Sequence, residues 1–150
     1  MIKTLLILVV LSLGVFSFRP DTTYCGRGLK GHVYKVTGNR MPSPDEPLPK
    51  PQGMKTTLYI YQLTNINDVI RSGQSPFYTS ISTPLVKEVE TNEKGYFKVK
   101  LKPGRYSLFV KKDNLFFSSM FDEKNNIHPV EVKAGSMTDV VFNVNYDATY

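Results

Sequence analysis

The chain contains one cysteine, Cys25, and two histidines, His32 and His128, and these are the side chains best suited to nucleophilic or acid–base chemistry. A cysteine acts as a nucleophile when the fold places a histidine and an orienting acid beside it. No sequence motif surrounds any of the three. We therefore expect Cys25 to be an unpaired thiol and His128 a solvated histidine, with a Cys25–His128 pair as the less favoured alternative. Whether Cys25 is modified stays open.

Metal ions and cofactors have no recognisable site in the sequence. A zinc site built from several thiolates is excluded because Cys25 is the only cysteine, and the two histidines lack the motif of a zinc hydrolase. The run from Asp122 to Asn126 lacks the order of a calcium loop and predicts a polar turn. No glycine-rich phosphate cradle follows a strand and opens a helix. The sequence predicts a chain that is not an enzyme and binds no cofactor or metal.

The aromatic side chains offer non-covalent recognition instead. Tyr59 and Tyr61 alternate with Leu58 and Ile60, and the segment from Leu115 to Phe121 contains more apolar bulk than one buried face can use. Contiguous exposed apolar area marks a binding surface, and interfaces favour Tyr and Phe. The alternative is that the sheets, or a proline-rich segment, cover these rings. The candidate partner-binding residues are Tyr59, Tyr61, Phe109, Phe116, Phe117 and Phe121.

The elements that position these side chains are predicted to be β-strands. Short runs rich in Val, Ile, Thr, Tyr and Phe are separated by clusters of Gly, Pro, Asn and Asp, which is typical of an all-β domain. Residues 115–121 are a candidate for a further strand, and residues 77–81 are a candidate extension of the strand expected at 85–91. The expected strands are 29–37, 57–63, 85–91, 96–101, 106–111, 130–132 and 140–146.

Two turns suggest how neighbouring strands pair. The sequence 92–95 suits a type I turn with Gly95 at positive φ, and Pro103–Gly104 suits a type II turn. Folding the strands back at these turns places Val89 opposite Val99 and the 96–101 strand beside the 106–111 strand. In this register Phe109 lies outward, and Lys87 falls on the inner face unless a bulge or a sheet edge displaces it.

Two segments depart from the strand pattern. Residues 41–53 are expected to form a loop because their prolines remove backbone donors. Residues 65–73 offer an Asn cap and a terminal glycine, which predicts one short helical turn. The prolines of the loop are Pro42, Pro44, Pro47, Pro49 and Pro51.

The N-terminus is predicted to be a signal peptide covering 1–18, because Lys3 precedes an apolar run that is short for a membrane span. Cleavage near Ser17 is expected, with a retained anchor as the alternative. The expected organisation is then a segment 19–28, a domain 29–146 and a tail 147–150. The net charge is +6 at pH 7. Because export and the dispersed basic residues argue against nucleic-acid binding, we expect no nucleic-acid partner. The predicted leader implies no stable transmembrane segment after its removal. It also implies a periplasmic, surface-associated or secreted location.

Five segments of the chain together carry a family resemblance: 29–33, 58–61, 91–99, 101–110 and 130–135. They resemble the carboxypeptidase regulatory-like domain family of exported bacterial proteins. The resemblance covers about Leu29 to Val144 and implies an antiparallel, transthyretin-like (prealbumin-like) β-sandwich of about seven strands with Greek-key connections. The proline-rich insert departs from simpler members.

The resemblance implies a non-catalytic module for protein interaction or structural support at the cell envelope, with an unknown envelope or extracellular protein as partner. A carbohydrate-binding module using exposed Tyr and Phe rings is the alternative. Hydroxyisourate hydrolases resemble the chain in outline, but they need several histidines and a different C-terminal sequence, so their activity is not expected here.

Overall fold

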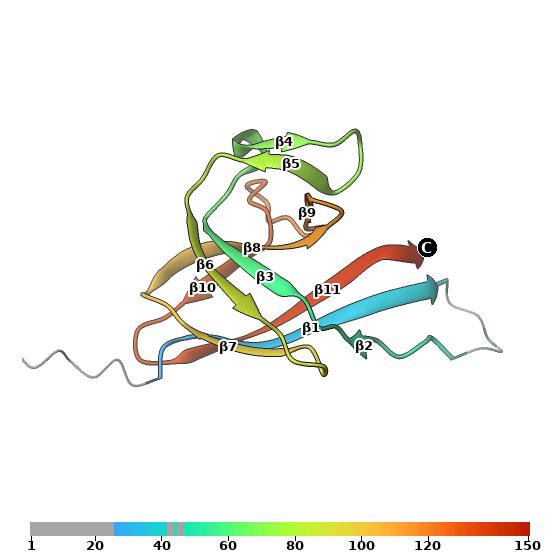
Figure 1. Ribbon diagram of the computed structural model, residues 1–150, viewed down its shortest axis with the longest axis horizontal. Helices are drawn as coiled ribbons and strands as arrows, with labels where there is room; N and C mark the ends of the chain where they lie inside the picture. The colour runs from blue at the N-terminus through green and yellow to red at the C-terminus, as the bar shows by residue number, and fades with distance from the viewer. Residues whose placement is uncertain (1–25, 42–43, 45–46) are drawn as a thin grey trace, which may run out of the picture.

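The computed structural model describes residues 26–41, 44 and 47–150, and it is an all-β sandwich. The predicted signal peptide and Cys25 lie outside the described residues. One sheet has four strands and the other has seven, and Figure 1 shows the four-stranded sheet below the other. The four-stranded sheet contains β1 (Gly28–Asn39), β2 (Gln52–Gly53), β7 (Tyr96–Lys100) and β11 (Met137–Thr149). The seven-stranded sheet contains β3 (Thr57–Gln62), β4 (Val69–Arg71), β5 (Phe77–Ile81), β6 (Leu85–Glu90), β8 (Gly104–Lys112), β9 (Leu115–Phe117) and β10 (Pro129–Val132).

The main core lies between the two sheets, and alternation along the strands supplies it. Phe97, Leu108 and Phe142 are buried, as the alternation predicts, while Lys98 and Lys100 are exposed. A slip of one residue in any of these strands would turn its apolar side chains into water. The core residues from the four-stranded sheet are Leu29, Val33, Phe97, Val99, Val140, Phe142 and Val144, and those from the other sheet include Leu58, Ile60, Leu108, Val110, Phe117 and Val132.

The seven expected strands are all present, but the predicted hairpin pairing is wrong. β6 pairs with β3 and β7 pairs with β1, so the turn at 92–95 carries the chain from one sheet to the other. Pro103–Gly104 likewise leads from β7 to β8, which pairs with β3, β9 and β10. Lys87 is exposed because β6 is the edge strand of its sheet. Alternation therefore identified the inner side chains without identifying the neighbouring strands.

The turn at 92–95 changes sheet because its backbone is tied to β1. Gly95 has a φ of +77°, and a Cβ at this position would overlap the carbonyl oxygen of Val33. The amide of Val33 donates to the carbonyl of Gly95 over 2.8 Å. The Oδ1 atom of Asn92 accepts from the amides of Lys94 and Tyr96, each over 2.9 Å. A glycine is therefore required where the turn meets β1.

The strands β1 and β11 form the one parallel pair among the described strands, so the antiparallel expectation holds for the others only. Both strands are long, and β11 continues to Thr149 because it pairs with β1 as far as Asn39. The expected tail at 147–150 is therefore largely strand. Gly31 allows this pair to approach closely, since a Cβ there would overlap the carbonyl oxygen of Val140.

The 3-10 helix, the strand at 77–81, the strand that begins at Leu115 and the proline-rich segment agree with the sequence predictions only in part. The expected helical turn is a 3-10 helix, η1 (Ile66–Asp68), capped by the side chain of Asn65. Residues 77–81 form a separate strand, β5, that pairs with β4 and β9, and strand β9 ends at Phe117. The described part of the proline-rich segment is loop except for β2, which pairs with β1.

Candidate functional site

Three of the six predicted aromatic binding residues are buried. Tyr61 and Phe109 belong to a second apolar cluster on the outer side of the seven-stranded sheet, together with Tyr78 and Ile127. Their rings meet edge to face, with centroids 5.6 Å apart for Tyr61 and Phe109. Phe117 is fully buried in the main core. Phe109 therefore lies on the outer side of its sheet, as the register predicted, and it is covered there, which is the alternative stated for these rings.

The cover over the second cluster comes from β4, β5 and the segment before β10. Tyr78 of β5 lies 5.9 Å from Phe109, and Val69 of β4 and Ile127 pack on the same cluster. Figure 1 shows β4 and β5 stacked over the outer side of the sheet. The proline-rich segment lies elsewhere, because Pro49 accepts a hydrogen bond from Arg40 at the end of β1. The rings are covered by strands of the sheet and by the segment before β10, and not by the proline-rich segment that was the other expected cover.

The other three predicted residues reach the surface only in part or singly. Tyr59 and Phe116 are half-buried and perpendicular, and the Nζ atom of Lys111 lies 4.7 Å and 4.6 Å from their ring centroids. Phe121 is 40% exposed, with the guanidinium of Arg71 6.0 Å from its ring. These rings do not form a flat platform, so the sites predicted on this sheet lose support.

His128 is buried rather than solvated. Its ring stacks on Phe142 with centroids 4.5 Å apart, and the side chain is only 5% exposed. Burial lowers the pKa of His128 to about 4 because the charged imidazolium would lose its hydration. The imidazole is therefore neutral at pH 7 and enclosed in the fold. Among the described residues, no group of three His, Cys, Asp or Glu side chains could hold a metal ion.

The run from Asp122 to Asn126 is a polar turn, as predicted. Both carboxylate oxygens of Asp122 accept hydrogen bonds within it, from the amide of Lys124 over 2.9 Å and from the amide and side chain of Asn126 over 2.8 Å. Arg105 also donates to this carboxylate over 3.2 Å. The bonds from Asn126, followed by those from Lys124 and Arg105, lower the pKa of Asp122 to about 2. The turn uses its carboxylate to hold its own backbone.

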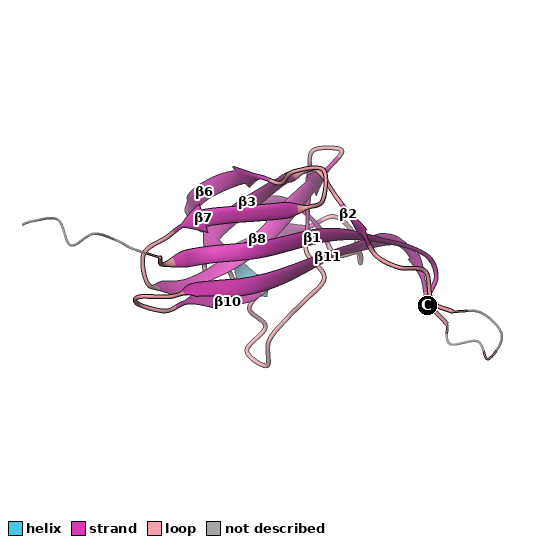
Figure 2. Cartoon of the chain, turned by 90° about the horizontal axis from the view of Figure 1, so that it is seen from below, coloured by secondary structure: helices cyan, strands magenta, loops and turns pink. Residues whose placement is uncertain are grey.

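The surface that stays open is the outer face of the four-stranded sheet, which Figure 2 turns toward the viewer. His32 and Tyr34 of β1 stack with centroids 5.5 Å apart and planes 7° apart, and Tyr96 of β7 lies 5.3 Å from His32. These three rings, the aromatic row, cross from β1 to β7. Val141 of β11, directly beside His32 in the register, is 56% exposed. This face therefore presents rings and an aliphatic side chain to water.

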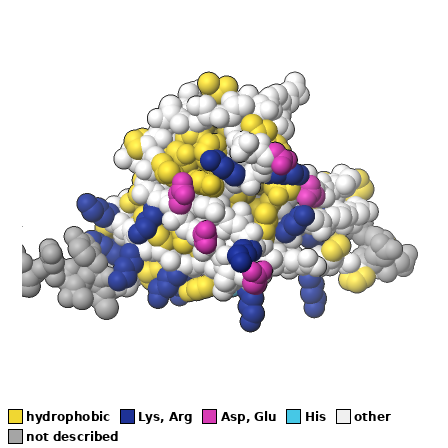
Figure 3. All heavy atoms as spheres, viewed as in Figure 1, with side chains coloured by type: hydrophobic (Ala, Val, Ile, Leu, Met, Phe, Trp, Pro, Cys, Tyr) yellow, Lys and Arg dark blue, Asp and Glu magenta, His cyan; other side chains and the backbone are white. Residues whose placement is uncertain are grey.

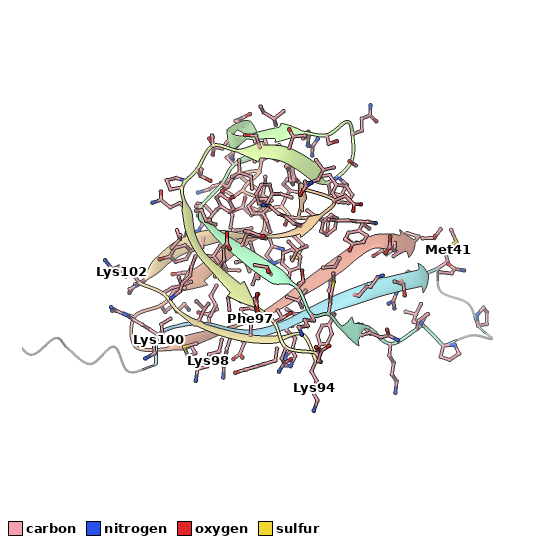
Figure 4. The ribbon with its side chains drawn as sticks, in the orientation of Figure 1. Met41, Lys94, Phe97, Lys98, Lys100 and Lys102 are labelled. Atoms are coloured by element: carbon pink, nitrogen blue, oxygen red, sulfur yellow. The ribbon has the colours of Figure 1, made fainter. Side chains whose placement is uncertain are left out.

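A row of lysines borders the aromatic row along β7. Lys94, Lys98, Lys100 and Lys102, here called the lysine row, occupy even-numbered positions with Tyr96, while the odd positions Phe97, Val99 and Leu101 enter the core. Figure 4 places the lysine row along the lower and left rim of the molecule, and Figure 3 shows basic side chains projecting from the same rim.

The lysine row is not neutralised by the fold. Within the described residues, ion pairs hold Lys30, Lys35, Lys55, Arg105 and Lys112, and no acidic oxygen lies within 4.0 Å of the Nζ atoms of the lysine row. The segment 94–102 contains no Asp or Glu. Lys100, Leu101 and Lys102 line a hollow together with Arg27 at the end of the row. This edge of the open face therefore carries positive charge.

Sequence reasoning missed this face although a signal was present. Lys30, His32 and Tyr34 alternate with Leu29, Gly31 and Val33, so their outward direction followed from the two-residue period. The surplus of aromatic residues at 115–121 indicated a binding surface on the other sheet instead.

Among the described residues, no helix has the length and apolarity needed to cross a membrane. Comparison with known proteins finds no matching family model, no matching curated protein and no matching solved structure.

Proposed function

We propose that this chain is an exported, non-catalytic binding module of the cell envelope that holds its partner against the outer face of the four-stranded sheet. The observation that carries the proposal is the aromatic row, His32, Tyr34 and Tyr96, lying beside exposed Val141. Rings with an apolar body and a polar edge suit a surface that alternates between water and a partner.

The contrast between the two sheets supports this assignment. The seven-stranded sheet also carries aromatic rings on its outer side, in the second apolar cluster, and residues of β4, β5 and η1 cover them. The four-stranded sheet has no such cover among the described residues, and on its outer face Tyr96 is 37% exposed while His32 and Tyr34 are half-buried. Uncovered apolar area on a folded domain is a recurrent feature of interaction sites.

The sequence supports the remaining parts of the proposal. The signal peptide predicted at 1–18 favours export, and the resemblance to the carboxypeptidase regulatory-like domain family favours an accessory role without catalysis. That resemblance favours a protein partner first and a carbohydrate second. The rings proposed for contact are now those of the four-stranded sheet, in place of Tyr61, Phe109 and Phe117, which are buried.

The test is site-specific photo-crosslinking in intact producing cells. A photoreactive phenylalanine analogue replaces Val141 on the open face or, as a control, Ile70 of β4, which is 64% exposed on the other sheet. The proposal expects a reproducible high-mass adduct from position 141, discrete for a protein partner and polydisperse for a carbohydrate, and no such adduct from position 70. Equal adduct patterns from both positions, or no adduct from position 141, contradict it.

A further inference from the structure

We propose that the partner of this face is an acidic polysaccharide, bound with its carboxylates along the lysine row and its sugar rings against the aromatic row. The proposal rests on the binding function assigned above and specifies the chemistry of the partner. Two observations carry it: Lys98 and Lys100 lie on the outer face of β7, and the rings of Tyr96 and His32 border them.

The spacing of the lysine row suits a linear polyanion. Residues two apart on a strand lie on the same face about 6.7 Å apart, which is the separation expected between Lys98 and Lys100 on β7, and Lys102 follows in the connection to β8. None of these ammonium groups forms an ion pair with an acidic side chain of the described residues. A chain with repeated carboxylates contacts several of them together and releases its counterions when it binds.

The composition of the face favours a carbohydrate over a protein. Lysine is depleted at protein–protein interfaces, whose centres are enriched in large apolar residues. Among the described residues, Val141 is the one large aliphatic side chain beside the aromatic row, and Lys94 and Lys98 stand on either side of Tyr96 in the sequence. Tyr rings present a flat apolar surface with a polar edge, which matches a sugar ring with C–H groups on its face and hydroxyls at its rim.

The sheet register indicates that Lys98 does not serve the fold. Lys98 of β7 is directly opposite Lys30 of β1, and like charges in this arrangement destabilise a sheet. Lys30 is drawn toward Asp139 on its other side, with Nζ and Oδ1 3.6 Å apart, while Lys98 has no such partner among the described residues. A bound polyanion relieves this repulsion. Binding and stability therefore respond in opposite directions when Lys98 is neutralised.

The experiment measures binding of the purified full chain to polygalacturonate by calorimetry over a range of salt concentrations, with dextran as the neutral polymer. The test variant is Lys98→Gln/Lys100→Gln. The matched control is Lys87→Gln/Lys124→Gln, which removes the same charge from exposed lysines outside the four-stranded sheet. The test variant should lose at least about tenfold in affinity, and its log–log salt slope should fall by roughly two, whereas the control stays within about twofold.

Two further variants separate the contributions. Tyr96→Ala should weaken binding about tenfold, while Tyr96→Phe, which keeps the ring, should not. Lys98→Gln alone should raise Tm by about 1 to 4 °C because it removes the repulsion with Lys30. A lower Tm for Lys98→Gln contradicts the view that the fold gains nothing from this lysine.

The outcomes distinguish this inference from the function on which it rests. Equal losses in the test and control pairs overturn the assignment to the lysine row. Tighter binding to single-stranded DNA or to phosphatidylglycerol vesicles than to polygalacturonate overturns the ligand class. Failure to bind polygalacturonate, combined with a discrete protein adduct from position 141, overturns the polysaccharide and leaves the binding module intact. No adduct from position 141 removes the function itself.

Discussion

The buried histidine makes the stability of this domain depend on pH in a range where its carboxylates contribute little. His128 has an ordinary pKa of 6.5 when exposed and a pKa of about 4 in the folded chain, because burial disfavours its charged form. The folded state therefore binds fewer protons than the unfolded state between these two values. Stability is fully present above pH 6.5 and is lost as the pH falls toward 4.

The magnitude follows from the two pKa values. The whole difference corresponds to about 3 kcal/mol, and about 2 kcal/mol of it is lost between pH 7 and pH 5. For a domain of this size that loss lowers Tm by about 4 to 8 °C. The lowered pKa values of Asp122 and Asp147 act below about pH 4, where their unfolded forms begin to bind protons. Thermal unfolding followed by circular dichroism from pH 7 to pH 5 therefore isolates His128.

Two variants complete the experiment. His128→Phe keeps a ring against Phe142 and removes the titrating group, so its Tm should change little between pH 7 and pH 5. His32→Gln removes the other histidine and should retain the loss because His128 remains. A wild-type Tm that is constant over this range refutes the reasoning, as does a loss in His128→Phe equal to that of the wild type.

Three other predictions follow from packing and turn geometry. Gly31→Ala should lower the free energy of unfolding in urea by more than about 4 kcal/mol, because its Cβ overlaps a carbonyl oxygen of β11. Gly73→Ala, with no atom within 4 Å of the added Cβ, should lower it by about 1 to 2 kcal/mol, and equal losses contradict the close approach at Gly31. Phe109→Ala should cost about 3 to 5 kcal/mol and Phe121→Ala less than about 1, since only the first is buried, and a reversed order contradicts the covered cluster. Asp122→Ala should speed amide hydrogen exchange within its own turn and leave the core strands protected, and unchanged exchange in the turn contradicts its role as the acceptor.

The strand positions were predictable because side-chain period is a local property. Val140, Phe142 and Val144 alternate with Val141 and Asn143, and all three enter the core as expected. Strand pairing is not local. Both sheets turn an apolar face inward, so the alternation of β7 is the same whether it pairs with β6 or with β1. The expected pairing of Val89 with Val99 was misleading, because Val89 lies opposite Leu58 of β3.

The covering of the second cluster could not be predicted for a similar reason. Phe109 lies on the outer side of β8, and its alternation with Leu108 correctly indicates a different face. Whether that face meets water depends on Tyr78 and Ile127, which come from segments with weak patterns of their own. A two-residue period assigns a side chain to one side of a sheet, but the burial of that side depends on segments distant in sequence that fold over it.

The same distinction identifies where the sequence is free to serve a partner. Each inward position of β7 is fixed by packing, because replacing Phe97 or Val99 with a polar residue would place it in the core. The outward positions of β7 have no such packing requirement, and any polar residue would be compatible with the fold there. The chain nevertheless places Lys98 opposite Lys30, an arrangement that costs stability. Since neither solubility nor packing requires that pair, a ligand that neutralises it is the physical account we favour.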